Sequence, residues 1–463
     1  MRIRSFWPAL LLAFAAGCDD ALTVEPASEV PEEQAITDAN GARAALAGLY
    51  DALQDGSYYG GELLFFGDLP SDDVDHVGTF TDYGDADAND LRADNTSVLF
   101  IWDAIYAAIG RTNQLIARIP AVDGLSDDER NDFVGQAHFI RALAYHDLVK
   151  LWEGVPIRTE PPGSIDEASQ IARGSEAEVY AQILSDLDQA ETLISNTNTR
   201  MATVGAVVAL RSRVLLYAEN WAGAIAAADE VEALGYDLAP QFSDLFTPSG
   251  QDTPEDIFRV SFTPVEFNLV GFYYISRSFG GRREISPTFG LIDAFGYNAD
   301  PGYDPDTLQT LDDDDNIVFN PADSRAAWSI GFDFIGRRYG SKYPTTEGAE
   351  HVHVIRFGEV LLNRAEAYTR LNQLDEAIAD VNRIRVRAGL SELDATGMIQ
   401  QQVLDIVWEE RRLELAMEGF RWPDLVRTGR AVAVLGIPVF QTLFPIPQAE
   451  LDVAPNIAQN PGY

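Results

Sequence analysis

Hydrophobic side chains recur every three or four positions along several stretches of the chain. Residues 38–54 place Leu46, Leu49 and Leu53 at this spacing, and residues 97–119 repeat the pattern over a longer stretch. Because a helix has 3.6 residues per turn, such positions lie on one face and can pack against a core. The pattern therefore predicts two amphipathic helices.

Two serine residues mark the starts of further helices. Ser126 is followed three positions later by Glu129, and Ser175 by Glu178. In such a capping box, each side chain accepts a hydrogen bond from the backbone of the other residue, which satisfies amides that the first turn leaves free. We therefore expect helices that begin at these serines and end near residues 152 and 194.

Two predicted helical hairpins resemble each other. The first comprises residues 203–218 and 221–234, and the second comprises residues 356–371 and 373–388. Each has an aromatic residue near the end of its first helix and Ala-Ile early in its second, where small side chains permit close packing. This arrangement is typical of tetratricopeptide repeats, although the period is not sustained along the chain. A last long helix is expected over residues 398–417.

The segment between the hairpins, residues 236–350, has a different character. Asp, Gly, Pro, Tyr and Phe accumulate there. A segment of this length is too long for a simple connection inside a helical protein, so we expect it to carry function. The predicted fold class is mainly α, with tetratricopeptide-like helical hairpins packed with a large loop-rich region.

The N-terminus has the pattern of an export signal. Arg2 and Arg4 precede an apolar run over residues 6–16, and small residues follow directly before Cys18. Eleven apolar residues are too few to span a bilayer as a helix. The ending resembles a bacterial lipoprotein signal, which implies cleavage before Cys18 and lipidation of its thiol; an ordinary signal peptide that contains a cysteine is the alternative.

The signal divides the chain into four expected parts. Residues 1–17 form the lipoprotein signal peptide, and residues 18–34, which are polar and interrupted by prolines, form a tether between lipid and body. Residues 35–235 form an N-terminal helical part, and residues 236–463 a C-terminal part with the loop-rich region and closing helices.

Charge and cysteine content exclude several functions. The 463 residues include 33 Lys and Arg against 73 Asp and Glu, which gives a net charge of −40. So acidic a surface repels phosphate backbones, which argues against nucleic-acid binding. Cys18 is the only cysteine, so a disulfide framework, a cysteine-based zinc site and an iron–sulfur cluster are excluded.

Six segments of the chain carry a family resemblance. The most specific run extends from Glu410 to Asp424, and the others are residues 101–116, 136–149, 358–368, 382–390 and 444–463. In this order they resemble the SusD/RagB family of surface nutrient-binding lipoproteins. The resemblance implies an outer-membrane lipoprotein, exposed at the cell surface, that captures an oligosaccharide or other nutrient for a SusC-like TonB-dependent transporter. From the residues alone, the run 410–424 is interpreted as an internal group of ion pairs and packing contacts.

Two functional classes remain, a binding protein and a surface glycoside hydrolase that uses paired carboxylates. The chain has no Gly-x-Ser-x-Gly or His-Glu-x-x-His motif, and in a chain with 73 acidic residues paired acids arise by chance. We therefore predict a binding protein without catalytic residues, cofactor or bound metal. A divalent cation among Asp68, Asp72, Asp73 and Asp75 is an open alternative.

The predicted ligand site lies on two loops, residues 68–90 and 271–330. Proteins bind sugars by placing aromatic rings against pyranose faces and by bonding hydroxyl groups with carboxylates and arginine. These loops concentrate such groups, and the predicted ligand-binding residues are Asp72, Asp73, Phe80, Tyr83, Tyr274, Tyr297, Arg325 and Trp328. The alternative for Tyr297 and Trp328 is that they close a small core beneath the loop.

Overall fold

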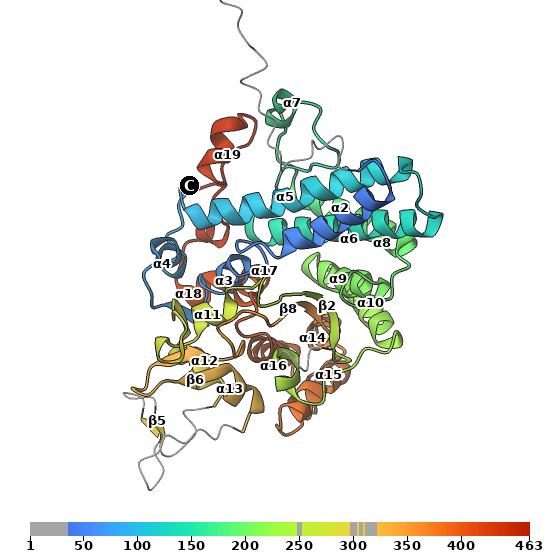
Figure 1. Ribbon diagram of the computed structural model, residues 1–463. Helices are drawn as coiled ribbons and strands as arrows, with labels where there is room; N and C mark the ends of the chain where they lie inside the picture. The colour runs from blue at the N-terminus through green and yellow to red at the C-terminus, as the bar shows by residue number, and fades with distance from the viewer. Residues whose placement is uncertain (1–35, 248–251, 297–302, 305–308, 311–321) are drawn as a thin grey trace, which may run out of the picture.

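The computed structural model describes residues 36–247, 252–296, 303–304, 309–310 and 322–463. Long helices form one side of the molecule, and short strands and helices form the other (Figure 1). Among the described residues, no helix is both long enough and apolar enough to cross a membrane. Cys18 and Tyr297 lie outside the described residues.

Four long helices dominate the N-terminal part of the fold: α2 (Ala39–Leu53), α5 (Thr96–Arg118), α6 (Asp127–Trp152) and α8 (Glu176–Leu193). Helix α5 packs against α2 and α6, and α6 packs against α8. Capping boxes start α6 at Ser126 and α8 at Ser175. The four helices and their expected starts are confirmed.

Both predicted hairpins are also present. Helices α9 (Val204–Tyr217) and α10 (Trp221–Ala233) form the first, and α14 (Phe357–Arg370) and α15 (Leu374–Arg387) form the second. The two hairpins lie side by side because α10 packs against α14, and the buried alanines of α10 allow this close approach. Helix α16 (Gln400–Glu414) packs on the second hairpin. The mainly α, tetratricopeptide-like fold class is confirmed.

The loop-rich side is built from short elements that the hydrophobic pattern did not predict. Strand β2 (Asp256–Val260) pairs antiparallel with β8 (Val352–Arg356), which leads into α14. Elements of two to six residues are too short to show a period. The others between residues 236 and 350 are η3 (Phe242–Phe246), α11 (Val270–Tyr274), η4 (Arg277–Phe279), β3 (Ile285–Pro287), α12 (Phe289–Ala294), β4 (Tyr303–Asp304), β5 (Gln309–Thr310), α13 (Ser324–Ser329), β6 (Ile330–Phe332) and β7 (Arg338–Gly340).

Short elements also occur elsewhere in the chain. They are α3 (Glu62–Phe66), β1 (Val74–His76), α4 (Thr81–Asp87), η2 (Ile119–Ala121), α7 (Ile165–Ser169), α17 (Arg421–Arg427), α18 (Ala431–Leu435), η6 (Val439–Thr442) and α19 (Gln448–Val453). Strands β1 and β3 pair antiparallel, as do β4 and β5, and β6 and β7.

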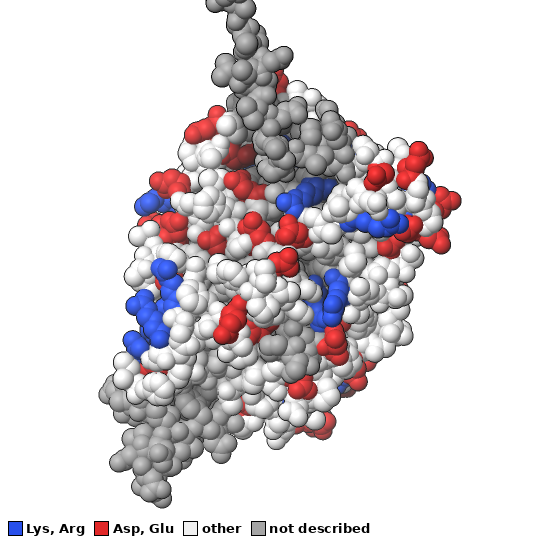
Figure 2. All heavy atoms as spheres, viewed as in Figure 1, with Lys and Arg blue, Asp and Glu red and all other residues white. Residues whose placement is uncertain are grey.

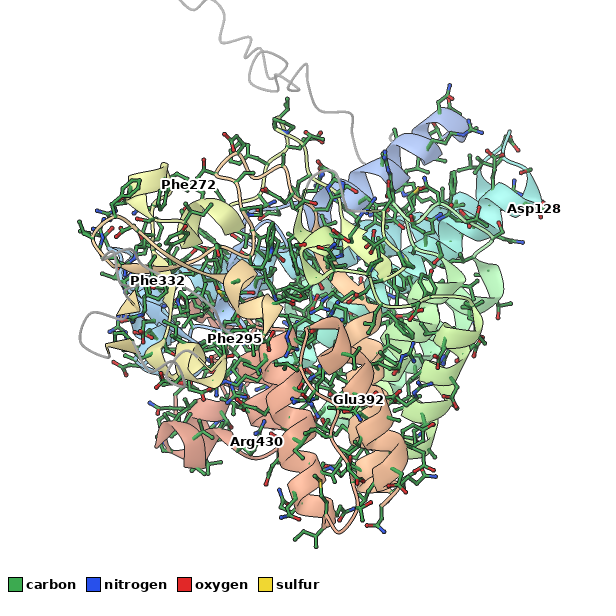
Figure 3. All side chains as sticks on the ribbon, turned by 90° about the horizontal axis from the view of Figure 1, so that it is seen from below. Asp128, Phe272, Phe295, Phe332, Glu392 and Arg430 are labelled. Carbon is green, nitrogen blue, oxygen red and sulfur yellow. The ribbon has the colours of Figure 1, made fainter. Side chains whose placement is uncertain are left out.

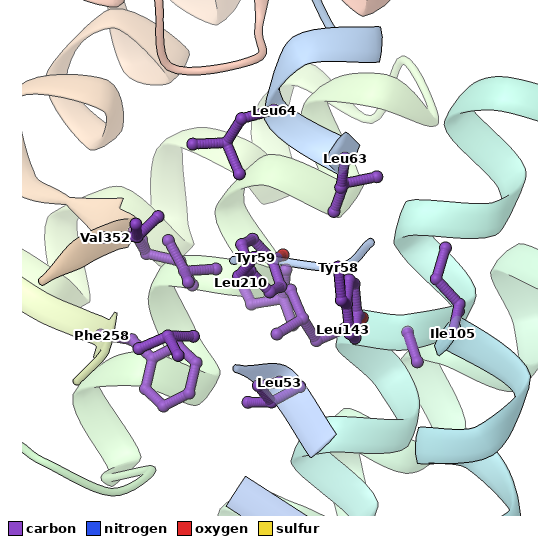
Figure 4. Close-up of a cluster of buried hydrophobic side chains, with 14 of the residues drawn as sticks. Leu53, Tyr58, Tyr59, Leu63, Leu64, Ile105, Leu143, Leu210, Phe258 and Val352 are labelled. Atoms are coloured by element: carbon purple, nitrogen blue, oxygen red, sulfur yellow. The ribbon is translucent and has the colours of Figure 1, made fainter. Parts of the chain in front are cut away.

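The largest hydrophobic core joins the helical side to the loop-rich side. Leu53 and Leu143 of the long helices lie in the same buried cluster as Phe258 of β2 (Figure 4). Within this core, the hydroxyl groups of Tyr58 and Tyr59 both donate to Asp147, at 2.9 and 2.8 Å. Burial of a polar group is tolerated when it is hydrogen-bonded, so this carboxylate and the two tyrosines fit the apolar interior.

Candidate functional site

The two loops proposed for ligand binding lie next to each other. Strand β1 pairs with β3, so that Val74 lies opposite Pro287 and His76 opposite Ile285. The amide of Val77 extends this pairing by donating to the carbonyl of Glu284 at 2.9 Å. The pairing brings α4, which follows β1, beside α11, which precedes β3.

Phe80 and Tyr273 form the partly exposed aromatic surface at this junction. Their ring centroids are 5.7 Å apart, and the guanidinium carbon of Arg282 lies 3.9 Å from the centroid of the Phe80 ring. Arginine above an aromatic face is attracted by the negative charge of that face. We call Phe80, Tyr273 and Arg282 the aromatic junction.

Glu284 holds the aromatic junction in place. Its buried carboxylate accepts the backbone N–H of Phe80 at 2.6 Å and pairs with Nε of Arg282 at 2.8 Å. Burial raises the pKa of Glu284, but the bonds from Arg282 and from the amides of Phe80 and Thr79 outweigh it, so the pKa is lowered. One ionised carboxylate therefore fixes both the ring and the guanidinium above it.

Two of the predicted ligand-binding tyrosines are interior residues. Tyr83 and Tyr274 are only 2% and 3% exposed. Tyr83 packs edge-on against Phe80 and Tyr273 at 5.3 and 6.3 Å, and therefore supports the aromatic junction from below. The expectation that Tyr83 and Tyr274 lie at the surface is wrong, because their rings complete the core.

Asp72 and Asp73 bond to arginines of the C-terminal helices. Asp72 pairs with Nε of Arg421 at 2.6 Å, and Asp73 with Nε of Arg412 at 2.6 Å. The pKa of Asp72 is lowered, since the bond and charge of Arg421 and the charge of Arg412 outweigh the effect of burial. These carboxylates join the first loop to α16 and α17, which leaves the buried Asp73 unable to reach a ligand.

The remaining acids proposed for a cation are also used internally. Asp68 accepts the backbone amides of Gly419 and Arg421, and Asp75 pairs with Arg338. In the part of the chain that the structure describes, no group of three or more His, Cys, Asp and Glu side chains is arranged to hold a metal.

Arg325 and Trp328 lie on α13, away from the surface of the first loop. Arg325 is fully buried and pairs with Asp323, Glu410 and Glu414, at 2.6, 2.8 and 3.0 Å. The expectation that Arg325 contacts a ligand is therefore wrong for a physical reason, because its charge is neutralised in the interior. Trp328 is half-buried and donates its Nε1–H to the carbonyl of Lys342 at 3.1 Å. Its role in binding stays a prediction.

Sequence reasoning missed Arg282 and Glu284. A usable signal was present, because Arg282-Arg283 and Arg337-Arg338 are two adjacent arginine pairs in a strongly acidic chain. Figure 3 places Phe272 and Phe332, from the same loop-rich region, on the side of the molecule opposite Asp128.

Two pockets of several hundred Å³ lie outside the aromatic junction. One, of about 690 Å³, is lined by residues of α6, α8 and α17, including Lys150, Tyr180 and Arg427. The other, of about 740 Å³, lies beside α2 and includes Tyr50 and Arg200. Neither pocket contains a residue that the sequence proposed for ligand binding.

Known proteins are similar to this chain in sequence and in fold. Residues 331–436 match a model described as the SusD family, and residues 61–216 match one described as starch-binding associating with outer membrane. The chain belongs to the SusD family. A SusD-like protein of Formosa agariphila is 28% identical over 93% of this chain and 92% of its own.

Solved structures of the SusD family agree with this assignment. A SusD superfamily protein from Bacteroides vulgatus superposes with a TM-score of 0.80 at 25% identity, covering 92% of this chain and 99% of the other. A structure described as a laminarin binding SusD-like protein has a TM-score of 0.74 at 24% identity, covering 92% and 100%. The match over residues 61–216 includes the first predicted ligand loop, residues 68–90, whereas the second predicted loop, residues 271–330, lies outside both matched segments.

Proposed function

We propose that this SusD family member captures an oligosaccharide at the cell surface and delivers it to a TonB-dependent outer-membrane transporter. The observation that carries the proposal is the aromatic junction, where partly exposed rings of Phe80 and Tyr273 carry the guanidinium of Arg282. Aromatic faces with adjacent hydrogen-bond donors suit the mixed apolar and hydroxyl surface of a sugar. The starch and laminarin named for similar proteins support a glycan ligand.

Binding without hydrolysis is the proposed activity. The similar proteins are described by what they bind. Asp72 and Asp73 of the first loop are bonded to Arg421 and Arg412, whereas a glycosidase needs two carboxylates that flank the bond to be cleaved. Incubation of the protein with labelled oligosaccharides tests the choice, since release of shorter products would favour the hydrolase.

Phe80→Ala should weaken oligosaccharide binding about five- to a hundredfold, because loss of one stacked ring typically removes about 1–3 kcal/mol. Isothermal titration calorimetry with starch and laminarin oligosaccharides measures the effect. Phe267→Ala is the matched control, since Phe267 is exposed beside α2 and α5. Equal loss in both variants would contradict a binding role for the aromatic junction.

Lipidation of Cys18 is the proposed means of anchoring. Cys18→Ser should move the protein from the outer-membrane fraction to the soluble fraction, because several acyl chains hold a protein at a membrane whereas a polar tether does not. Western blots of fractionated cells that lack the partner transporter measure this. A Cys18→Ser protein that still sediments with membranes in those cells would show that another anchor exists.

The partner is proposed to be a SusC-like TonB-dependent transporter. A captured oligosaccharide has to pass the outer membrane, and in the described residues no helix can span it. Purification of the tagged protein in mild detergent should therefore recover a much larger outer-membrane protein. Recovery of the isolated chain in several mild detergents would argue against a stable complex.

A further inference from the structure

A second cluster of rings and arginines lies on the loop-rich side, beyond the aromatic junction. The loop that contains η4 and the turn between β6 and β7 meet there. We call this cluster the arginine–aromatic surface, and its residues are Arg277, Phe279, Arg283, Phe334, Arg337 and Tyr339. This surface adjoins the aromatic junction, since Nε of Arg277 donates to the backbone carbonyl of Arg282 at 2.9 Å.

Asp333 fixes the two loops to each other. Its buried carboxylate accepts Oγ–H of Ser276 at 2.7 Å from one loop, and Nε–H of Arg337 at 2.8 Å from its own turn. These bonds outweigh burial and hold the pKa of Asp333 well below its usual range. Arg283 adds a second tie, because its Nε donates to the carbonyl of Arg338 at 2.8 Å. The surface is therefore held in one arrangement before any ligand binds.

The rings of this surface are turned to solvent. Phe279 and Phe334 lie 5.0 Å apart between centroids and are 42% and 79% exposed. Tyr339 lies 5.5 Å from Phe279 on the other side. Three adjacent rings, two of them well exposed, leave apolar area in water that a folded chain would otherwise bury, which is typical of an interaction site.

The arginines of this surface repel one another. The pKa of Arg283 is lowered, first by burial and then by the charges of Arg338, Arg337 and Arg277. Within the described residues, neither Arg277 nor Arg283 forms an ion pair with a carboxylate. Figure 2 shows basic side chains gathered on the left of this face, in the region where Figure 1 places α4, α11 and α12. Like charges this close destabilise one another, and a bound anion would relieve that repulsion.

We propose that the arginine–aromatic surface binds an anionic oligosaccharide, one whose sugars carry carboxylate or sulfate groups. This inference rests on the proposed glycan-binding function and names the class of glycan. The rings of Phe279 and Phe334 suit pyranose faces, and the guanidinium groups of Arg277 and Arg283 suit planar or tetrahedral oxyanions, which they bond through paired N–H groups. The acidic remainder of the molecule does not oppose binding, because charges more than about 8 Å away are largely screened at physiological salt.

Matched pairs of oligosaccharides test the proposal. Oligogalacturonides are compared with the same oligomers after carboxyl reduction, and sulfated galactan oligosaccharides with their desulfated forms, by calorimetry on the full chain carrying Cys18→Ser. We expect each anionic form to bind at least tenfold more tightly than its neutral counterpart, with an affinity that falls as salt rises. The uronate and sulfate pairs distinguish the two sources of negative charge.

Single substitutions test which residues cause the preference for anionic oligosaccharides. Arg277→Gln should weaken binding of the anionic form roughly tenfold and change binding of the neutral form little. Arg283→Gln also loses the bond to the carbonyl of Arg338, so it should weaken both forms, and the anionic form more strongly. Phe334→Ala should weaken both forms, since its ring contacts the sugar and not the anion. Arg43→Gln is the control, because Arg43 belongs to α2 and its side chain is exposed. Melting temperatures establish that each variant is folded.

Each other outcome overturns a defined part of the proposal. Equal affinity for anionic and neutral forms would leave glycan binding intact and refute the preference for anions. Binding of neither form by a folded protein that still binds starch or laminarin oligosaccharides would refute this inference and leave the proposed function intact, whereas failure to bind any of them would refute both. Unchanged affinity of Arg277→Gln and Arg283→Gln for the anionic oligosaccharide would show that the anion binds elsewhere. If poly-glutamate bound as tightly as the anionic oligosaccharide and lost affinity in the same two variants, the partner would be an acidic peptide.

Discussion

Glu414→Ala should lower the free energy of unfolding by about 3–5 kcal/mol, because it removes a buried carboxylate that three buried arginines share and leaves one positive charge uncompensated. The carboxylate of Glu414 contacts Arg325 at 3.0 Å, Arg387 at 2.5 Å and also Arg356. All four side chains are almost completely buried. Loss of this carboxylate therefore removes one partner from each of three arginines and leaves an excess positive charge in a medium that solvates it poorly.

The cost is large because the surrounding network is balanced in charge. Among the described residues, its acids are Glu255, Asp323, Glu410, Glu414 and Glu418, and its bases are Arg325, Lys342, Arg356, Arg385 and Arg387. Five acids and five bases therefore pair with one another in this network. Removal of any one acid leaves an excess positive charge that the interior cannot screen.

Urea unfolding at pH 7 measures this effect, with Glu409→Ala as the matched control. Glu409 belongs to the same helix, but its side chain is 48% exposed and lies 3.8 Å from Arg412. An exposed pair contributes at most about 1 kcal/mol, so the control should be nearly neutral. Similar losses in Glu409→Ala and Glu414→Ala would mean that the arginines find other partners.

The dependence of stability on pH should also report the interaction of Glu414 with its arginines. Burial raises the pKa of Glu414, but the charges of Arg387, Arg356 and Arg325 lower it further, so the folded-state pKa lies well below the ordinary value of 4.5. The carboxylate then contributes stability above pH 4.5, and this contribution is lost as the pH falls through the folded-state pKa. Glu414→Gln should therefore lose less stability than the unmodified protein between pH 4.5 and 3.

The sequence predicted the long helices well because their signals are local. Capping boxes at Ser126 and Ser175, and apolar periods such as that of residues 38–54, depend only on residues within a few turns. The run from Glu410 to Asp424 was also interpreted correctly as internal. Its pairing was not foreseen, since Arg411 bonds Asp424 in the next helix at 2.7 Å and not an acid one turn away.

The ligand surface was predicted only in outline. The adjacency of the two loops followed from their composition, but the sequence could not tell which aromatic rings face solvent. Tyr83 is buried and Phe80 is partly exposed, because the ring of Tyr83, on α4, packs against Phe66 with 5.6 Å between centroids. Arg325 was predicted to contact a ligand because nothing in its local sequence indicates an ion pair. Its partners Glu410 and Glu414 are more than eighty residues away in the chain.

A close contact of two backbones joins the first ligand loop to the C-terminal helices. The carbonyl of Gly67, directly after α3, accepts the N–H of Trp422 at 2.9 Å. The next residue, Asp68, accepts the N–H of Gly419 at 2.8 Å. These bonds require that the two chain segments approach without an intervening side chain, so Gly67 determines where the loop that carries Phe80 begins.

Gly67→Ala should destabilise the protein by about 2–3 kcal/mol and weaken oligosaccharide binding, because an added Cβ overlaps backbone that cannot move aside. The Cβ would lie 2.3 Å from the carbonyl oxygen of Gly419 and 2.7 Å from its Cα. The φ of Gly67 is −76°, which alanine adopts freely, so the whole loss comes from this contact. Gly110→Ala in α5 is the control, since its Cβ meets nothing within 4 Å and the variant should gain up to about 1 kcal/mol. Urea unfolding and calorimetry measure both, and a Gly67→Ala protein as stable as Gly110→Ala would show that the two backbones can separate without cost.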